Sequence, residues 1–146
     1  MRKIIVLLCF TLFISACSSS TKTASKPEGV GQDIWNTGLT YAVIINEFLK
    51  EDIKISGGTL SERIGQFSNP DNKKDNTNAE LSILDYVKEL AIHAVSYQAF
   101  GAESSKKSYD EYFSKLESIY GKGSLIIENV DNDLYDEVIH EYSKMF

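Results

Sequence analysis

The sequence predicts an all-α fold, a small bundle of four main helices and one short helix, within a single domain over residues 32–146. Three observations favour this fold class. Apolar side chains recur at the three- and four-residue spacing of a helix face in every long segment. Glycine or capping residues bound these segments. The β-branched run at 125–127 could be a lone extended segment, but one strand without a partner forms no sheet.

The first predicted helix spans residues 33–53 and carries a continuous apolar stripe. One row of positions follows the helical repeat, and a second row widens it. The stripe consists of Ile34, Trp35, Gly38, Leu39, Tyr41, Ala42, Ile45, Phe48 and Leu49. The glycine pair at 57–58 breaks the helix.

A short helix follows, because Thr59 and Glu62 have the spacing of a capping box. Its expected buried residues are Leu60, Ile64 and Phe67. Residues 68–78 then contain no apolar side chain except one proline. We expect this segment to be an exposed loop.

The strongest predicted helix, residues 79–100, is expected to be the centre of the bundle. Thr77 and Glu80 again have the spacing of a capping box, and Gly101 fits the C-terminal stop. The apolar positions cover a little more than half of the circumference, which indicates packing on several sides. These positions are Leu81, Leu84, Val87, Leu90, Ala91, Ala94, Val95 and Tyr97. A narrow polar wedge consists of Ser82, Asp85, Glu89 and Ser96.

Two further helices are expected over residues 106–120 and 132–145, the first ending at Gly121 and the second capped by Asp131. The apolar face of the first consists of Tyr109, Tyr112, Phe113, Leu116, Ile119 and Tyr120. That of the second consists of Leu134, Tyr135, Val138, Ile139 and Tyr142. Tyrosine is also enriched at interfaces, so the pattern leaves open which tyrosines face outwards.

The N-terminal segment indicates where the protein resides. Two basic residues precede an apolar run of eleven residues, 4–14. Such a run is too short to span a bilayer, which needs about 20 apolar residues, and it is typical of a cleavable signal. The run closes on Ile14-Ser15-Ala16-Cys17, which resembles the lipobox of bacterial lipoproteins.

The resemblance covers the first 20 residues and implies that residues 1–16 are a signal peptide. It also implies that Cys17 becomes the new N-terminus, carrying a thioether-linked diacylglycerol and, in many species, a further acyl chain such as palmitate. Two or three acyl chains are enough for stable anchoring to a membrane. The protein would then sit on the cell membrane facing outside the cytoplasm, or in the periplasm. The alternative is an ordinary secretory signal cut after Ala16, with Cys17 unmodified.

Residues 17–31 are rich in Ser, Thr and Gly, and this composition predicts a flexible linker. Removal of the signal leaves 13 basic and 21 acidic residues, a formal charge of −8. Binding to nucleic acid needs a basic footprint, and a peripheral hold on anionic lipid needs polybasic clusters, neither of which is present. Cys17 is then the remaining cysteine, so we expect no disulfide and no thiolate metal site.

Glu89 and His93 form one candidate metal face. They lie four residues apart on one helix and could share a cation, with Asp85 one turn earlier. Di-iron bundles, however, take Glu-x-x-His motifs from two helices and two further glutamates. A charge pair at the edge of a solvated wedge is the simpler interpretation.

A second candidate is the acidic segment that contains Asp131, Asp133, Asp136, Glu137 and Glu141. It does not match the calcium loop of an EF-hand, because counting from the first aspartate places tyrosines at ligand positions 5 and 12. Acidic residues are favourable in the first turn of a helix. A like-charged ridge at 133, 137 and 141 predicts a solvated face or contact with a basic partner.

The sequence contains none of the catalytic templates for a serine nucleophile elbow, a zinc protease or a phosphate-binding loop. Neither His93 nor His140 has neighbours that suggest a catalytic base. We therefore expect no enzyme, no cofactor and no metal.

Two functions remain open. One is a lipid-anchored module that binds another protein at the cell envelope, as a complex subunit, an inhibitor or immunity-type protein, or an exclusion factor. The other is a bundle that binds a small ligand or peptide between its helices. A cleft lined by Trp35 and tyrosines would favour the ligand, and a flat apolar patch rimmed by acids would favour the protein.

Overall fold

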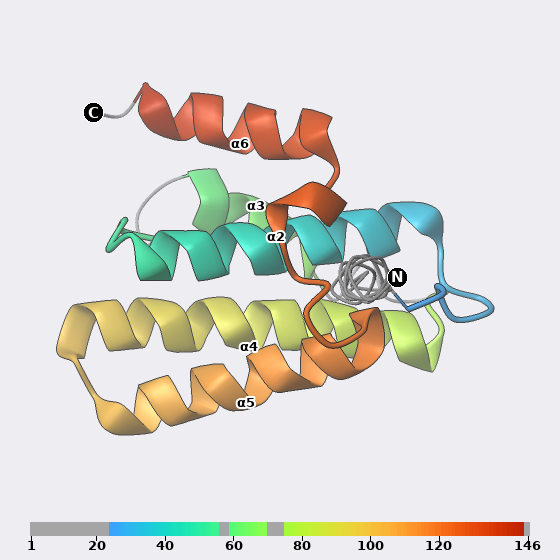
Figure 1. Cartoon of the computed structure of the whole chain (residues 1–146), viewed down its shortest axis with the longest axis horizontal. Helices are drawn as coiled ribbons and strands as arrows, with labels where there is room; N and C mark the ends of the chain where they lie inside the picture. The colour runs from blue at the N-terminus through green and yellow to red at the C-terminus, as the bar shows by residue number, and fades with distance from the viewer. Residues whose placement is uncertain (1–23, 56–58, 70–74, 145–146) are drawn as a thin grey trace, which may run out of the picture.

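The computed structural model describes residues 24–55, 59–69 and 75–144 (Figure 1). Its elements are α2 (Gln32–Lys50), α3 (Thr59–Phe67), α4 (Asn78–Phe100), α5 (Glu103–Tyr120), the 3₁₀ turn η2 (Ile127–Asn129) and α6 (Asn132–Ser143). Within these ranges there is no β-strand. The predicted fold class, four main helices and one short helix, is confirmed.

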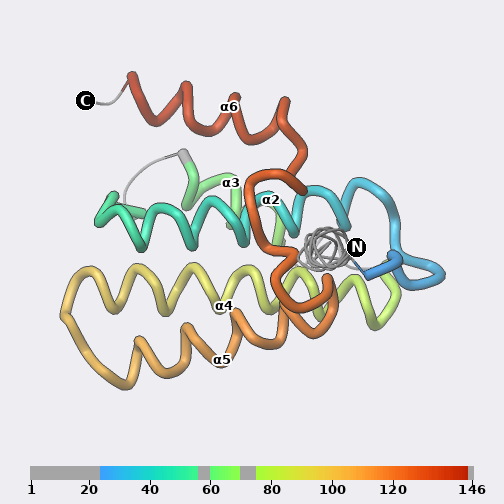
Figure 2. Tube along the Cα trace, in the orientation of Figure 1, coloured from blue at the N-terminus to red at the C-terminus, as the bar shows by residue number. Residues whose placement is uncertain are grey.

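The helices form layers around α2. Figure 1 shows α4 and α5 side by side as an antiparallel pair, with α2 between this pair and α6. The tube in Figure 2 follows the same path, and α3 packs against both α4 and α6. Helix α4 contacts three other helices, as the breadth of its apolar surface predicts.

Helix α2 is nevertheless the most enclosed element. Eight consecutive residues, from Gly38 to Ile45, are buried, whereas the sequence places residues 79–100 at the centre. The difference arises because Val43 and Ile44, which lie outside the predicted stripe, are also fully buried. The α6 layer and η2 pack on α2 from the side opposite α4 and α5, so its outer face does not reach solvent.

Gly38 allows α2 to come close to α4 and α5. A Cβ atom at this position would lie 2.5 Å from Ile83 Cγ2 and 2.6 Å from the Tyr120 hydroxyl. That hydroxyl donates a hydrogen bond to the Trp35 carbonyl oxygen at 3.0 Å, and the two rings pack with centroids 4.3 Å apart. Burial raises the pKa of Tyr120. Trp35 is therefore a core residue and does not line a cleft.

The two ends of α4 are as predicted. The Thr77 hydroxyl accepts a hydrogen bond from the Glu80 amide, and the Glu80 carboxylate accepts one from the Thr77 amide at 2.7 Å. Gly101 ends the helix with a left-handed φ of 63°. The predicted capping box of α3 involves the side chain of Thr59, and this side chain is not among those that the structure describes.

The buried face of α4 is turned relative to the predicted one. Its buried apolar residues are Ile83, Leu84, Val87, Leu90, Ala91 and Ala94. Ile83 is fully buried although the predicted face omits it, because it packs at the close approach to α2. Leu81, Val95 and Tyr97, which were expected in the core, are only partly buried.

Residues 24–31 pack against the helices, although the sequence predicts a linker as far as residue 31. Val30 is 3% exposed. The Ala24 amide donates to the Tyr120 carbonyl oxygen at 2.8 Å, and the Gly31 amide donates to Glu80 Oε1 at 2.7 Å. The Glu80 carboxylate thus accepts amides at the start of both α2 and α4. The folded part of the chain therefore includes residues 24–31.

The Glu80→Gln variant tests this double cap. Hydrogen bonds from the Gly31 and Thr77 amides hold the pKa of Glu80 below its usual range. The carboxylate therefore adds stability above the ordinary glutamate pKa of about 4.3, and this contribution is lost as the pH falls through the lowered value. Glutamine keeps one accepting oxygen and replaces the other with an NH2 group, which cannot accept the Gly31 or Thr77 amide. We therefore expect a loss of about 1 kcal/mol near neutral pH.

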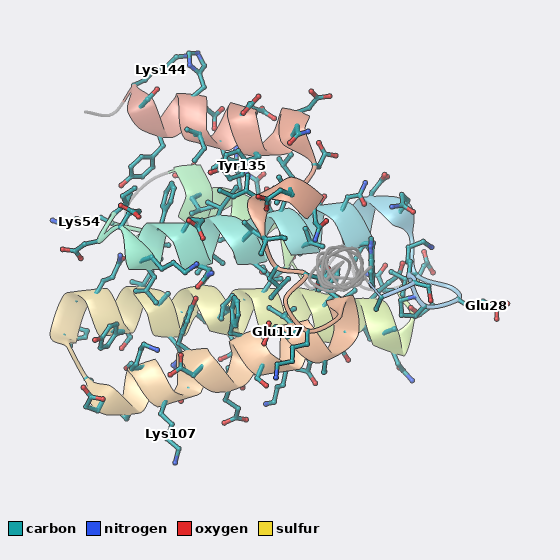
Figure 3. The ribbon with its side chains drawn as sticks, viewed as in Figure 1. Glu28, Lys54, Lys107, Glu117, Tyr135 and Lys144 are labelled. Atoms are coloured by element: carbon teal, nitrogen blue, oxygen red, sulfur yellow. The ribbon has the colours of Figure 1, made fainter. Side chains whose placement is uncertain are left out.

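Urea unfolding of both proteins measures this difference at neutral pH and in acid. The gap between wild type and variant should narrow in acid, where the wild-type carboxylate becomes protonated. Glu28 points into solvent (Figure 3), so Glu28→Gln is the matched control and should leave stability unchanged. An equal gap at both pH values would show that the carboxylate charge has no role.

The remaining elements differ from expectation mainly at their ends. Helix α5 begins at Glu103, three residues before the predicted start, and the Ser105 and Ser96 hydroxyls are 2.9 Å apart. Helix α6 is capped as predicted, because Asp131 accepts the Leu134 amide at 3.2 Å. The run at 125–127 is extended at its middle residue and then enters η2, and its first residue is buried. Residues 70–74 of the predicted loop lie outside the described ranges.

Candidate interaction surface

The predicted lipidation site, Cys17, lies outside the described residues, as do the signal peptide and the first part of the linker. The described chain starts at Ala24, which is hydrogen-bonded at the C-terminal end of α5. In Figure 1 this end of the bundle also contains the first turns of α2 and α4.

An apolar groove of about 400 Å³ lies between α3 and α4. Its walls are formed by Ile64 from α3 and by Ala91, Ile92 and Val95 from α4, with serine and asparagine side chains of the α3 region at one side. Ile92 is 48% exposed, which is unusual for a large aliphatic side chain in the middle of a long helix. Lys88 is the charged residue of the lining.

Gly65 opens this groove on the α3 side. A Cβ atom placed on it would meet nothing within 4 Å, in contrast to Gly38, where it would clash. A glycine inside a helix costs about 1 kcal/mol relative to alanine. The packing described within this chain therefore gives no reason for a glycine at position 65.

The predicted polar wedge of α4 is partly covered by α5. His93 Nε2 lies 3.8 Å from Glu89 Oε2, and its ring stacks on Tyr112 with centroids 5.7 Å apart. Lys115 lies 4.3 Å above the Tyr112 ring and pairs with Glu111 at 2.7 Å. These residues thus form a mixed aromatic and charged contact between two helices, and Ile92 faces solvent instead.

The acidic ridge of α6 has a cationic partner within the chain. Arg63 of α3 donates from Nη2 to Glu137 at 2.7 Å, and its Nε and Nη2 atoms donate to the two oxygens of Glu141 at 3.0 and 2.9 Å. The hydrogen bonds from Arg63 hold the pKa of Glu141 below its usual range. Asp133 and Asp136 remain exposed.

Sequence reasoning missed Arg63 because it lies 78 residues before Glu141. No local spacing connects two residues at that separation. The composition did single out Arg63, since the chain has 15 basic residues and uses arginine at just two positions, 2 and 63. The planar guanidinium forms two parallel hydrogen bonds to a carboxylate, which a lysine cannot do.

The Arg63→Ala variant is expected to lose about 1 to 2 kcal/mol of unfolding free energy. This exceeds the usual value for a surface ion pair, because the guanidinium contacts two carboxylates and is partly buried. Val138 is the one buried residue of α6, so the stability of this helix depends on its ion pairs with Arg63. Hydrogen exchange of the α6 amides, together with urea unfolding, measures the effect.

Arg63→Lys should recover less than half of the loss, since it cannot donate to both oxygens of Glu141. A double-mutant cycle with Glu141→Ala isolates the pair and should give a favourable coupling energy. Additive losses would show that the pair of Arg63 and Glu141 does not contribute to stability.

The eight tyrosines of the chain are all at least partly buried. Tyr41, Tyr109 and Tyr120 are buried, and the remaining tyrosines are partly buried. The part of the chain that the structure describes has no cluster of three or more His, Cys, Asp or Glu side chains able to hold a metal. In the same ranges, no helix has the length and apolar character needed to cross a bilayer.

Comparison of the chain with protein-family models, curated proteins and solved structures found no match.

Proposed function

We propose that this protein is a bacterial lipoprotein, held at the membrane by acyl chains on Cys17, and that its acidic helical domain binds another protein at the cell envelope. The main support for the lipid anchor is the sequence Ile14-Ser15-Ala16-Cys17 at the end of an apolar run of eleven residues. The exposed apolar groove between α3 and α4 supports the binding role, because an unpartnered apolar surface typically marks an interaction site.

The proposed anchor also orients the domain. Ala24 follows Cys17 by seven residues, which can span at most about 25 Å. Since Ala24 is bonded at the C-terminal end of α5, this end would lie nearest to the membrane. Helix α4 starts at the same end, and its 23 residues extend about 35 Å from there. The groove lies along the middle of α4 and would remain accessible above the lipid surface.

A protein partner suits the groove better than a small ligand. Small-molecule sites enclose most of the ligand and contain several converging polar groups. Here Ile92 is exposed to solvent, and the Ser68 hydroxyl in the lining already donates to the Ile64 carbonyl oxygen. Trp35, which would mark a ligand cleft, is in the core.

A peptide or small ligand remains the second candidate, because a volume of about 400 Å³ falls within the range of ligand sites. The two candidates differ in the bound species. Purification of the full-length protein from native membranes should yield a stable complex with another protein. Recovery of the chain alone, with a small molecule or peptide bound, would favour the second candidate.

The Cys17→Ala variant tests the anchor. We expect it to abolish incorporation of labelled palmitate, and the protein should remain unprocessed or be shed into the medium. Cys9→Ala is the matched control and should keep the label, since residue 9 lies within the segment that would be removed. Unchanged labelling of Cys17→Ala, or no labelling of the wild type, would overturn the proposed anchor.

A further inference from the structure

We infer that the groove between α3 and α4 receives an amphipathic helix of the partner protein, with an acidic residue of that helix paired to Lys88. This inference rests on the proposed protein-binding function and adds the chemistry of the bound segment. It follows from the shape of the groove, from Gly65 and from the charge of the lining.

The shape of the groove fits a helix. Two helices form its walls, and small residues on each wall, Gly65 and Ala91, permit the backbone of a third helix to come close. Ile92 projects beside them with almost half of its surface exposed, as an apolar contact for that helix. Helices that bind in such grooves present apolar residues at positions i, i+3 or i+4, and i+7.

Gly65 is the second observation that points to a partner. Open space surrounds the place of its missing Cβ, so the fold itself does not need a glycine there. A glycine is required where another backbone approaches closely. The exposed position of Gly65, on the groove side of α3, is where a docked helix would make that approach.

Lys88 determines the charge of the bound segment. Lys88 is the cation in the lining of the groove. Within the described ranges Lys88 forms no ion pair. A docked helix would remove this ammonium group from water, and a desolvated charge requires an opposite charge. The partner helix therefore supplies an aspartate or glutamate next to its apolar face.

Site-specific photo-cross-linking in native membranes tests the inference with the full-length, lipid-anchored chain. A benzophenone amino acid replaces Ile92 in one variant and Lys107 in the control, where the side chain points away from the bundle (Figure 3). Mass spectrometry then identifies the attached segment. We expect position 92 to attach to a segment with apolar residues at helical spacing and an acidic residue beside them, and position 107 not to do so.

Two substitutions in the position 92 background make the test specific. Gly65→Ala should raise the melting temperature of the purified protein by about 4 °C, because alanine favours the helix and has room. It should also lower the cross-link yield about tenfold, since the added methyl group occupies the contact. Lys88→Glu should lower the yield by a similar factor, and an acidic-to-lysine change in the identified segment should restore it.

Each alternative occupant gives a distinct contrary result. Cross-links solely to a second copy of this chain or to lipid, or to a segment that is extended or basic, would overturn the inference. An unchanged yield in Gly65→Ala would also overturn it. If a partner co-purifies but attaches equally at position 107, the groove is not its site and the proposed function stands. If no protein partner is recovered by either method, the proposed function itself fails.

Discussion

Leu84→Ala is expected to lower the free energy of unfolding by about 2 to 5 kcal/mol, because it leaves a cavity in the core. Leu84 is 2% exposed and lies on α4, which packs against three other helices. Surrounding side chains held from several sides cannot collapse fully into the space. For a domain of this size, each kcal/mol lowers the melting temperature by about 4 to 8 °C.

Urea unfolding and thermal melting followed by circular dichroism measure the loss. Ile92→Ala is the matched control on the same helix, and it should change stability by less than about 0.5 kcal/mol because Ile92 is 48% exposed. For Val95→Asp, the sequence pattern and the structure lead to different expectations. The predicted core position of Val95 would make this charge prevent folding, whereas its place in an open groove should leave the protein folded. Equal losses in Leu84→Ala and Ile92→Ala would contradict the arrangement of α4.

Gly38→Ala is expected to destabilise the protein by about 1 to 3 kcal/mol, although alanine favours a helix over glycine by about 1 kcal/mol. The new Cβ would lie 2.5 Å from Ile83 Cγ2 and 2.6 Å from the Tyr120 hydroxyl. Neither neighbour can move away easily. Ile83 is branched at Cβ and fully buried, and the Tyr120 hydroxyl is bonded to the Trp35 carbonyl oxygen. The helices must therefore separate.

Gly65→Ala provides a control of the same chemistry and should stabilise the protein, since its Cβ meets open space. Tyr120→Phe removes one of the two clashing atoms at position 38. In a double-mutant cycle, Gly38→Ala should therefore cost less in the Tyr120→Phe background than in the wild type. If both glycine substitutions shift the unfolding midpoint in the same direction, the close approach at Gly38 is wrong.

Residues close together in the sequence made much of the fold predictable. The capping box of Thr77 and Glu80, the Asp131 cap and the left-handed Gly101 depend on bonds between residues at most four apart. Helix ends were least predictable where the next turn is polar. Helix α5, for example, begins at Glu103, three residues before its predicted start at residue 106.

The candidate site was less predictable, because each part of it depends on contacts between distant segments. The hydrophobic pattern of α4 does not indicate which of its apolar residues will lack a packing neighbour. Ile92 is exposed because α3 is short and α5 packs on the Glu89 and His93 side. The openness at Gly65 follows from the same spacing of helices. Sequence patterns alone therefore did not locate the groove.

The sequence by itself determined the helices, their caps, the acidic balance of the chain and the lipobox-like segment that ends at Cys17. These properties arise from local backbone preference, short-range hydrogen bonds and composition, which need no tertiary contact. The tertiary structure decided that α2 is the most enclosed helix, that Glu80 caps two helices and that Arg63 pairs with Glu137 and Glu141 of α6. The bonds between Gly31 and Glu80 and between Arg63 and Glu141 join residues 49 and 78 positions apart, and close packing in three dimensions selects such pairs.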